Sequence, residues 1–206
     1  SRGLPTLEGH SVGLRKTLRA TILAVRDRKI PHLAAYMFST ENWKREADEV
    51  AYLMELFQVG IREELEELGR EGVRMRFVGQ RERFSPELQA GMRDIEERTA
   101  KNDRLTFWAC LSYGGRAEIV AAAEALRGSD EPITEESLGR HLWTADMPDA
   151  DIIIRTSGEK RVSGFLTWKG VYSELFFIDM HWPDFDEKAL DGVLEEYAAR
   201  ERRMGK

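Results

Sequence analysis

The sequence predicts an α/β fold, a single three-layer domain in which helices flank a largely parallel central sheet. Short apolar runs typical of buried strands alternate with amphipathic helical patterns along the chain. Polar and glycine residues gather directly after several of these runs, as they do where the carboxyl ends of a parallel sheet bind ligands. No repeat, low-complexity tract or interdomain linker divides the 206 residues, an ordinary length for one domain.

Composition limits the possible classes of function. Apolar residues make up 42% of the chain, enough for an ordinary core, and the formal net charge is −6. A nucleic-acid-binding domain usually carries a basic face, so the acidic balance argues against that class. The single cysteine, Cys110, excludes an internal disulfide framework. No apolar run approaches the ~20 residues of a membrane span and no signal-peptide pattern opens the chain, so we expect a cytoplasmic protein with at most peripheral membrane contact.

The first half of the chain is predicted to alternate helices with strands. A helix is expected after a loop at residues 1–10, from the near-3.6 spacing of Leu14, Leu18, Ile22 and Val25. An apolar run at 32–38 predicts a strand. The apolar stripe of residues 47–70 predicts the clearest helix, and the stripe suits either core packing or the lining of an apolar ligand channel. A strand at 73–79 and a helix begun by Ser85 and Pro86 follow.

The second half continues the alternation. Strands are predicted at 105–111 and at 152–154, where three β-branched residues suit a strand buried in a parallel sheet. Helices are predicted at 117–126 and 134–143. A final helix is expected from the capping-box-like spacing of Asp184 and Glu187, and its apolar face holds Leu190, Val193, Leu194 and Tyr197.

The strongest candidate site follows the 152–154 strand. Within nine residues the chain places Arg155, Thr156, Ser157, Gly158, Glu159, Lys160, Arg161 and Ser163. Arginine forks and hydroxyl donors suit a phosphate or diphosphate. For one arginine alone a surface salt bridge is the simpler interpretation, whereas the whole cluster favours a ligand. Further on, Glu174 enters an apolar run, where a lone carboxylate is costly unless it is paired or holds a metal.

Two other predicted strand ends carry polar residues. In the string that follows residue 38, Ser39 and Asn42 suit either phosphate binding or a helix N-cap, and Arg45 adds a positive charge. After residue 111, the glycines of S-Y-G-G-R precede a helix and can admit a phosphate to backbone donors, although two glycines alone are a weak signal.

These strings resemble one family. R-T-S-G-E-x-R-x-S-x-F-L-x-W, Y-S-E-L-F-F, H-W-P-D-F, F-S-T-E-N-W-x-R and Y-G-G-R are similar to motifs of the cis-prenyltransferases, the undecaprenyl diphosphate synthase family. The sequence departs from the family at Gly164 and Ser112, which replace a usual asparagine, and at Met37, where long-chain members usually have alanine. Strand alternation predicts that Met37 shares a face with Ala35 and Ser39.

The family also carries a first strand and a D-G-N-x-R-W motif with a catalytic aspartate, and neither is present here. We therefore expect residues 1–206 to form a single catalytic domain that is N-terminally incomplete and impaired as an enzyme.

The resemblance implies a Mg²⁺-dependent condensation of isopentenyl diphosphate with an allylic diphosphate such as farnesyl diphosphate, which makes new double bonds in cis. Carried over by position, the catalytic residues are His10, Ser39, Asn42 and Arg45, the substrate-binding residues are Trp43, Arg155, Arg161, Ser163 and Arg203, and the metal ligand is Glu174. Family members are usually homodimers, and Arg203 lies in a C-terminal R-x-G string that resembles one reaching a partner's active site.

Alternatives remain open. Some family members make short products or join two allylic diphosphates irregularly. A non-catalytic relative that binds polyprenyl diphosphates or supports a catalytic partner is a second possibility, favoured by the missing motif. A nucleotide-binding α/β protein is disfavoured, because neither a G-x-x-x-x-G-K-[ST] loop nor a G-x-G-x-x-G turn occurs.

Overall fold

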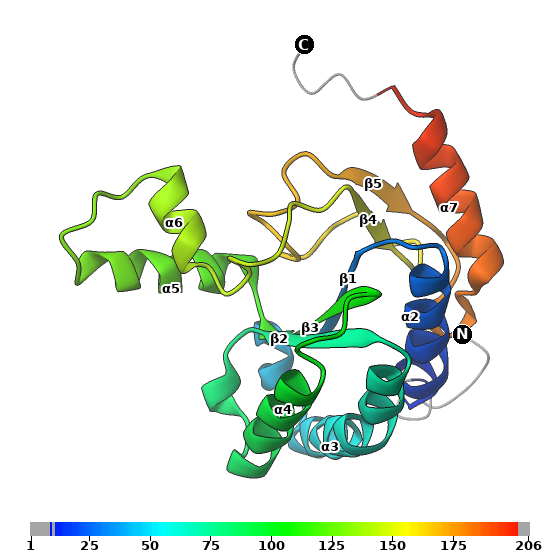
Figure 1. Ribbon diagram of the computed structural model, residues 1–206, viewed down its shortest axis with the longest axis horizontal. Helices are drawn as coiled ribbons and strands as arrows, with labels where there is room; N and C mark the ends of the chain where they lie inside the picture. The colour runs from blue at the N-terminus through cyan, green and yellow to red at the C-terminus, as the bar shows by residue number, and fades with distance from the viewer. Residues whose placement is uncertain (1–8, 10, 202–206) are drawn as a thin grey trace.

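The computed structural model describes residue 9 and residues 11–201, so two predicted site residues, His10 and Arg203, lie outside the described part (Figure 1). Helices and strands alternate as far as residue 113; two helices and then two strands follow, and the second of these strands, at 174–177, is not among those predicted. The strands are β1 (His32–Ser39), β2 (Val73–Val78), β3 (Leu105–Tyr113), β4 (Ile152–Arg155) and β5 (Glu174–Phe177). The main helices are α2 (Leu18–Asp27), α3 (Ala47–Arg70), α4 (Pro86–Arg98), α5 (Gly115–Arg127), α6 (Glu135–His141) and α7 (Glu187–Ala199). Shorter helical turns are η1 (Gly13–Thr17), η2 (Thr40–Lys44), η3 (Arg81–Arg83) and η4 (Trp182–Asp184).

The strands pair in parallel, which confirms the α/β class, but they form two hydrogen-bonded sets. One has the order β1-β3-β2, and the other joins β4 to β5. Within the described residues, β1 and β4 are each paired on one side only. The sheet is therefore divided between β1 and β4, which the sequence pattern did not predict.

The larger apolar core lies between the β1-β3-β2 set and helices α2, α3 and α4, and Figure 1 shows α3 and α4 on this face. β3 lies at its centre, where Phe107 and Leu105 are almost fully buried beside Ile22 and Met92. Each such side chain contributes roughly 1.5–3 kcal/mol by burial. The apolar stripe of α3 belongs to this core, because Phe57 and other members of the stripe are buried in it.

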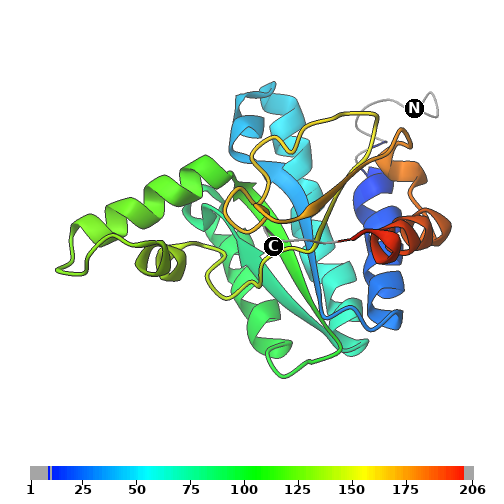
Figure 2. The same ribbon diagram turned by 90° about the horizontal axis from the view of Figure 1, so that it is seen from above.

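The opposite face of the sheet is covered mainly by the segment around residues 142–170, whose Met147 and Leu166 pack on Trp108 and Tyr113. Figures 1 and 2 show α5 and α6 projecting from one side of the sheet, with α2 and α7 on the other side. No helix in the described ranges is long and apolar enough to cross a bilayer.

Paired irregularities interrupt β1 and β3 near their carboxyl ends. Tyr36 is opposite Cys110, Phe38 is opposite Leu111 and Ser39 is opposite Tyr113, so Met37 and Ser112 each stand outside the one-to-one register. Strict alternation would place Met37 and Phe38 on opposite faces, yet both pack against the larger core. The predicted common face for Met37 and Ser39 is therefore wrong, because a bulge reverses the alternation after Met37.

Helix caps follow the sequence signals with one correction. The Ser85 hydroxyl accepts the Leu88 N–H and begins α4 as predicted. The cap of the final helix is not Asp184, which lies in η4 behind Pro183. Asp186 stands directly before the helix, and its Oδ1 accepts the Ala189 N–H at 2.9 Å. The early turn separates Asp184 from the first free N–H groups of α7, so the nearer carboxylate caps them.

Candidate functional site

The site begins at the carboxyl end of β4, where Arg155 is the last strand residue. Ser157 and Gly158 follow with φ of 71° and 70°, so the backbone turns sharply through the left-handed region. Their N–H groups donate to the carbonyls of Met180 and Ile178 at 2.8 and 3.0 Å. These two backbone donors therefore tie the turn to the end of β5, and the cations and hydroxyls remain as the groups that can take a ligand.

The cations of this turn differ in their partners. The Arg161 guanidinium forms an ion pair with Glu159, and both side chains are well exposed. Such surface pairs are worth about 0–1 kcal/mol, so a phosphate can displace the carboxylate at little cost. Among the described residues, the half-buried Arg155 guanidinium has no carboxylate partner. A partly desolvated, unpaired arginine at a strand end is suited to an anionic ligand.

Residues 161–165 fold back over the sheet, and for the role proposed for them below they are called the diphosphate turn. Ser163 and Gly164 have φ of 51° and 78°. The Gly164 carbonyl accepts the Gly115 N–H at the start of α5 at 2.9 Å. A Cβ on Gly115 would lie 2.1 Å from the Thr167 Oγ1, so only glycine allows this approach. Glycine at 164 suits the left-handed backbone, which asparagine also tolerates, and this accounts physically for that departure from the family.

The second predicted cluster forms a turn of its own at η2. The Ser39 hydroxyl accepts the Asn42 N–H at 3.3 Å, and the Asn42 Oδ1 accepts the Ser39 N–H at 2.8 Å. This reciprocal capping box is the N-cap alternative raised by the sequence. The Arg45 guanidinium donates to the Glu49 carboxylate at 2.7 Å. The capping box orders the turn and leaves the Asn42 amide nitrogen as a donor.

Trp43 is built into the fold. Its indole N–H donates to the Ser112 hydroxyl at 2.8 Å, and its ring packs edge-on against Phe38. The Arg83 guanidinium lies over the ring at 4.5 Å from the centroid. Any contact of Trp43 with a substrate must therefore use the ring, because the N–H is already bonded. Ser112, with φ of 49°, occupies the bulge of β3 and supplies the acceptor.

The structure brings the two clusters together around Tyr36 of β1, a residue that the sequence analysis missed. The phenol oxygen lies 3.2 Å from the Tyr113 carbonyl and 3.5 Å from that of Ser163. Burial, with a smaller contribution from Glu41, raises the pKa of Tyr36 to about 12, while the Ser39 hydroxyl and Arg155 act in the opposite direction, so both charges lie within electrostatic range of the phenol. The carboxyl ends of β1, β3 and β4 thus share one polar edge.

Glu174 lies at the other end of the β4-β5 pair from Arg155. It begins β5 opposite Ile152, whereas Arg155 is opposite Phe177, three residues further along the pair. At about 3.3 Å per residue the two positions are separated by about 10 Å along the strands. Glu174 Oε2 forms an ion pair with Arg200 Nη1 at 2.7 Å. The sequence left two alternatives for this carboxylate, an ion pair or a metal. In this structure it forms the ion pair with Arg200.

No group of three or more His, Cys, Asp or Glu side chains that could hold a metal occurs in the described part of the chain. The described residues therefore do not by themselves form a cage for Mg²⁺. Mg²⁺ is commonly bound by one or two carboxylates together with substrate phosphates, so a protein cage is not required for this ion.

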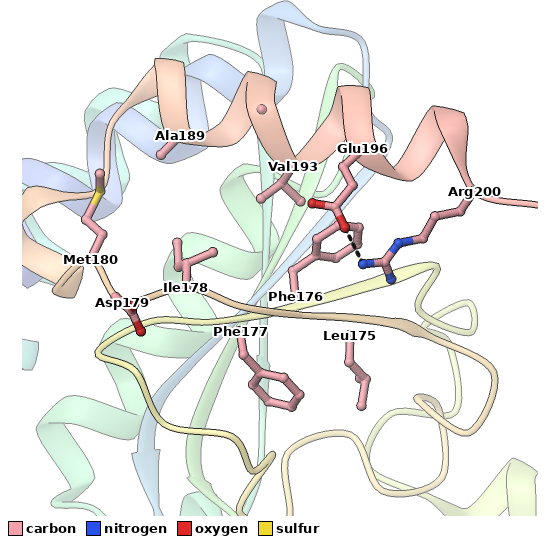
Figure 3. Close-up of a pocket in the computed structure, with 11 residues that line it drawn as sticks. Leu175, Phe176, Phe177, Ile178, Asp179, Met180, Ala189, Val193, Glu196 and Arg200 are labelled. Carbon is pink, nitrogen blue, oxygen red and sulfur yellow. Dashed lines mark hydrogen bonds and ion pairs between the residues drawn. The ribbon is translucent and has the colours of Figure 1, made fainter.

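A hollow of about 400 Å³ lies between β5 and α7 (Figure 3). Its lining is mostly apolar, with Phe176, Ile178 and Val193 on facing walls, and the Glu196–Arg200 ion pair closes one end. Arg200 also lies over the Phe176 ring at 4.0 Å from its centroid. Leu175 and Phe177 on the same strand are exposed. Figure 3 shows Leu175 and Phe177 pointing away from α7, so both faces of β5 carry apolar side chains.

Glu118 is a second residue that the sequence did not reveal, and it holds Tyr113 at the carboxyl end of β3. Glu118 in α5 is fully buried, and its carboxylate accepts from the Tyr113 phenol at 2.6 Å and from the Thr144 N–H and hydroxyl at 2.8 and 2.7 Å. Burial and Glu118 both raise the pKa of Tyr113, which keeps the phenol a donor. Nothing in the local sequence distinguishes this glutamate from exposed ones on other helices.

Comparison with known proteins gives one consistent result. The family model described as putative undecaprenyl diphosphate synthase matches residues 1–205. Isoprenyl transferase 2 of Bradyrhizobium diazoefficiens is 44% identical, with all of this chain aligned to 84% of that protein. The ditrans,polycis-undecaprenyl-diphosphate synthase of Pseudomonas aeruginosa is 42% identical with the same coverage. The crystal structure of lavandulyl diphosphate synthase from Lavandula x intermedia, in complex with dimethylallyl diphosphate, superposes with a TM-score of 0.93 at 28% identity, covering 100% of this chain and 91% of that one. With a family model that spans almost every residue, the chain belongs to the undecaprenyl diphosphate synthase family, the cis-prenyltransferases.

Proposed function

We propose that this protein is a prenyltransferase that elongates prenyl chains in cis, condensing isopentenyl diphosphate with an allylic diphosphate. One observation carries the proposal. Two turns rich in donors, one with Arg155, Arg161 and Ser163 and the other with Ser39 and Arg45, meet at one polar edge around Tyr36. A condensation of two diphosphates needs two anion sites side by side. Family membership supplies the reaction class.

The chain's own residues would act through charge and position. Arg155, Arg161 and Ser163 would hold isopentenyl diphosphate, since Arg155 has no carboxylate partner among the described residues and Arg161 has only an exposed one. Ser39, Asn42 and Arg45 would lie around the allylic diphosphate. The leaving diphosphate gains negative charge as its C–O bond breaks, and fixed arginines stabilise that charge in the transition state. Trp43 would contribute its ring face. His10 and Arg203 keep the roles that the resemblance implies.

Mg²⁺ is part of the proposal as a cofactor that would neutralise diphosphate charge when bound. Substrate oxygens would supply most of its ligands, because the described residues form no cage. Glu174 is the carboxylate that the resemblance assigns to the ion, and it would have to exchange Arg200 for the metal.

We also infer that a further parallel strand lies between β1 and β4 in the complete protein. Within the described residues each of these two strands has one unpaired edge, and the apolar residues Leu33, Ala35 and Ile154 are only half-buried. Parallel sheets are normally buried and open edges are normally covered. A strand that preceded α2 could enter this position by an ordinary right-handed crossover through α2 to β1.

A homodimer is the proposed assembly. Val120, Leu175 and Phe177 are exposed on α5 and β5, as large apolar side chains are at protein interfaces. These side chains would be buried by a second copy. Light scattering tests the assembly directly, and a monomer across micromolar concentrations would contradict it.

The experiment that tests the function is product analysis. A form extended at its amino end should convert farnesyl diphosphate and labelled isopentenyl diphosphate to longer cis products, seen by chromatography after dephosphorylation. The 206-residue form should bind isopentenyl diphosphate but make little product. Robust synthesis by the 206-residue form would contradict the strand proposal, and an extended form without product would favour a non-catalytic relative.

Irregular condensation of two allylic diphosphates is the second candidate. Its support is the close superposition on lavandulyl diphosphate synthase together with the departures at Met37, Ser112 and Gly164. Incubation with dimethylallyl diphosphate alone distinguishes the two reactions, because only the irregular reaction gives a product without isopentenyl diphosphate.

A further inference from the structure

Tyr36 lies between the two donor-rich turns, and its ring packs against the diphosphate turn. The ring stacks on Phe165 with centroids 5.0 Å apart and planes at 16°. It also meets the Tyr113 ring edge-to-face at 5.9 Å. Contacts of this kind contribute beyond simple burial and have a preferred geometry. The ring therefore holds Phe165, and with it the end of the turn, against the carboxyl end of β1.

The hydroxyl adds a directed contact. It lies 3.2 Å from the Tyr113 carbonyl and 3.5 Å from the Ser163 carbonyl, so its single proton can be donated to either. Because the pKa of Tyr36 is raised to about 12, chiefly by burial, the phenol remains a neutral donor at physiological pH. One side chain thus joins β1, β3 and the diphosphate turn.

The turn needs such anchors. Ser163 and Gly164 are both in the left-handed region, a costly conformation for serine that persists only when the surroundings enforce it. The side chains of Arg161 and Ser163 are exposed and do not fix the turn from the solvent side. The Gly164 carbonyl is held by the N–H of Gly115, and the contacts of Tyr36 hold its two neighbours, Ser163 and Phe165.

We propose that Tyr36 is a positioning residue for the isopentenyl diphosphate site. It sets the distance between the diphosphate turn and the end of β1, so that Arg161 and Ser163 present their donors to one diphosphate. The assignment of that site rests on the proposed function. Tyr36 acts through the turn and does not itself contact the substrate.

The test is Tyr36→Phe in the 206-residue chain, because this change removes the hydroxyl and keeps the stacked ring. Isothermal titration should show the Kd for isopentenyl diphosphate rise by about two- to tenfold, as expected for one neutral hydrogen bond. The Kd for dimethylallyl diphosphate should change by less. Amide hydrogen exchange without ligand should accelerate at residues 161–165. Tyr52→Phe in α3 is the matched control and should change none of these.

A second variant, Phe165→Leu, removes the stack and keeps the hydroxyl, and it should give the same selective pattern. A wild-type chain that binds no isopentenyl diphosphate would overturn the proposed function itself. If wild type binds and Tyr36→Phe binds equally well, the role of Tyr36 is wrong. Equal weakening for both diphosphates, with faster exchange throughout the sheet, would also overturn it, because that pattern indicates general loss of stability.

Discussion

The β1-β3-β2 set and the β4-β5 pair are both parallel and apolar, yet they differ in how completely they are covered. β3 is paired on both edges and packed on both faces, and almost all of its residues are buried. β5 exposes Leu175 and Phe177, and in the part of the chain that the structure describes β4 and β5 are each paired with one strand only. The β1-β3-β2 set, with β3 at its centre, therefore supplies most of the buried core, whereas the β4-β5 pair carries Arg155 and the exposed apolar side chains for which we propose a ligand and a second copy.

The largest expected effect tests where stability resides. Phe107→Ala in β3 should lower the free energy of unfolding by about 3–5 kcal/mol, because it leaves a cavity in a fully buried core. Val171→Ala, before β5, should change it by about 0.5 kcal/mol or less, since that side chain is 68% exposed. Urea unfolding measures both. Similar losses of unfolding free energy for the two variants would contradict this difference between the two sets of strands.

The next effect tests where binding resides. Arg155→Ala should weaken isopentenyl diphosphate binding by about 10- to 150-fold, because a charged hydrogen bond contributes roughly 1.5–3 kcal/mol. Arg161→Ala should show a smaller loss, since its guanidinium is more exposed and already paired with Glu159. Arg74→Ala in β2 is the control in the β1-β3-β2 set and should leave the affinity unchanged. Titration that shows unchanged affinity for both turn variants would refute the assignment.

A smaller effect concerns α7, which lies beside β5 of the β4-β5 pair. Asp186→Ala should destabilise the protein by about 0.5–2 kcal/mol, because the Ala189 N–H loses its cap. Asp184→Ala should cost less, although this residue has the capping-box spacing. Thermal unfolding of the two variants separates them, and a larger loss at Asp184 would restore the cap predicted from the sequence.

The smallest expected effect concerns Met37 at the bulge of β1. Met37→Ala removes a flexible side chain that packs against the larger core, and it should lengthen the products if that side chain narrows the hydrocarbon path. An extended, active form is needed, with dephosphorylated products compared by chromatography. An unchanged distribution of product lengths would show that Met37 only packs in the core and does not limit the length of the hydrocarbon product.

Much of the site could be predicted because its signals are local. The positions of Arg155, Ser163, Ser39 and Asn42 at strand ends follow from apolar periodicity and the polar strings that interrupt it. Tyr36 and Glu118 could not be found in this way. Their roles depend on carbonyls and hydroxyls that lie far away in sequence, such as those of Ser163 and Thr144.

The sequence by itself determined the α/β class, the order of the helices and of every strand except β5, and the family, because these depend on periodicity within a few turns or on strings of adjacent residues. Only the tertiary structure decided that the strands form two sets, that bulges at Met37 and Ser112 reverse the alternation, and that Glu174 pairs with Arg200. These features depend on which segments meet after folding. A side chain takes the partner that long-range packing brings within bonding distance, and local spacing does not contain that information.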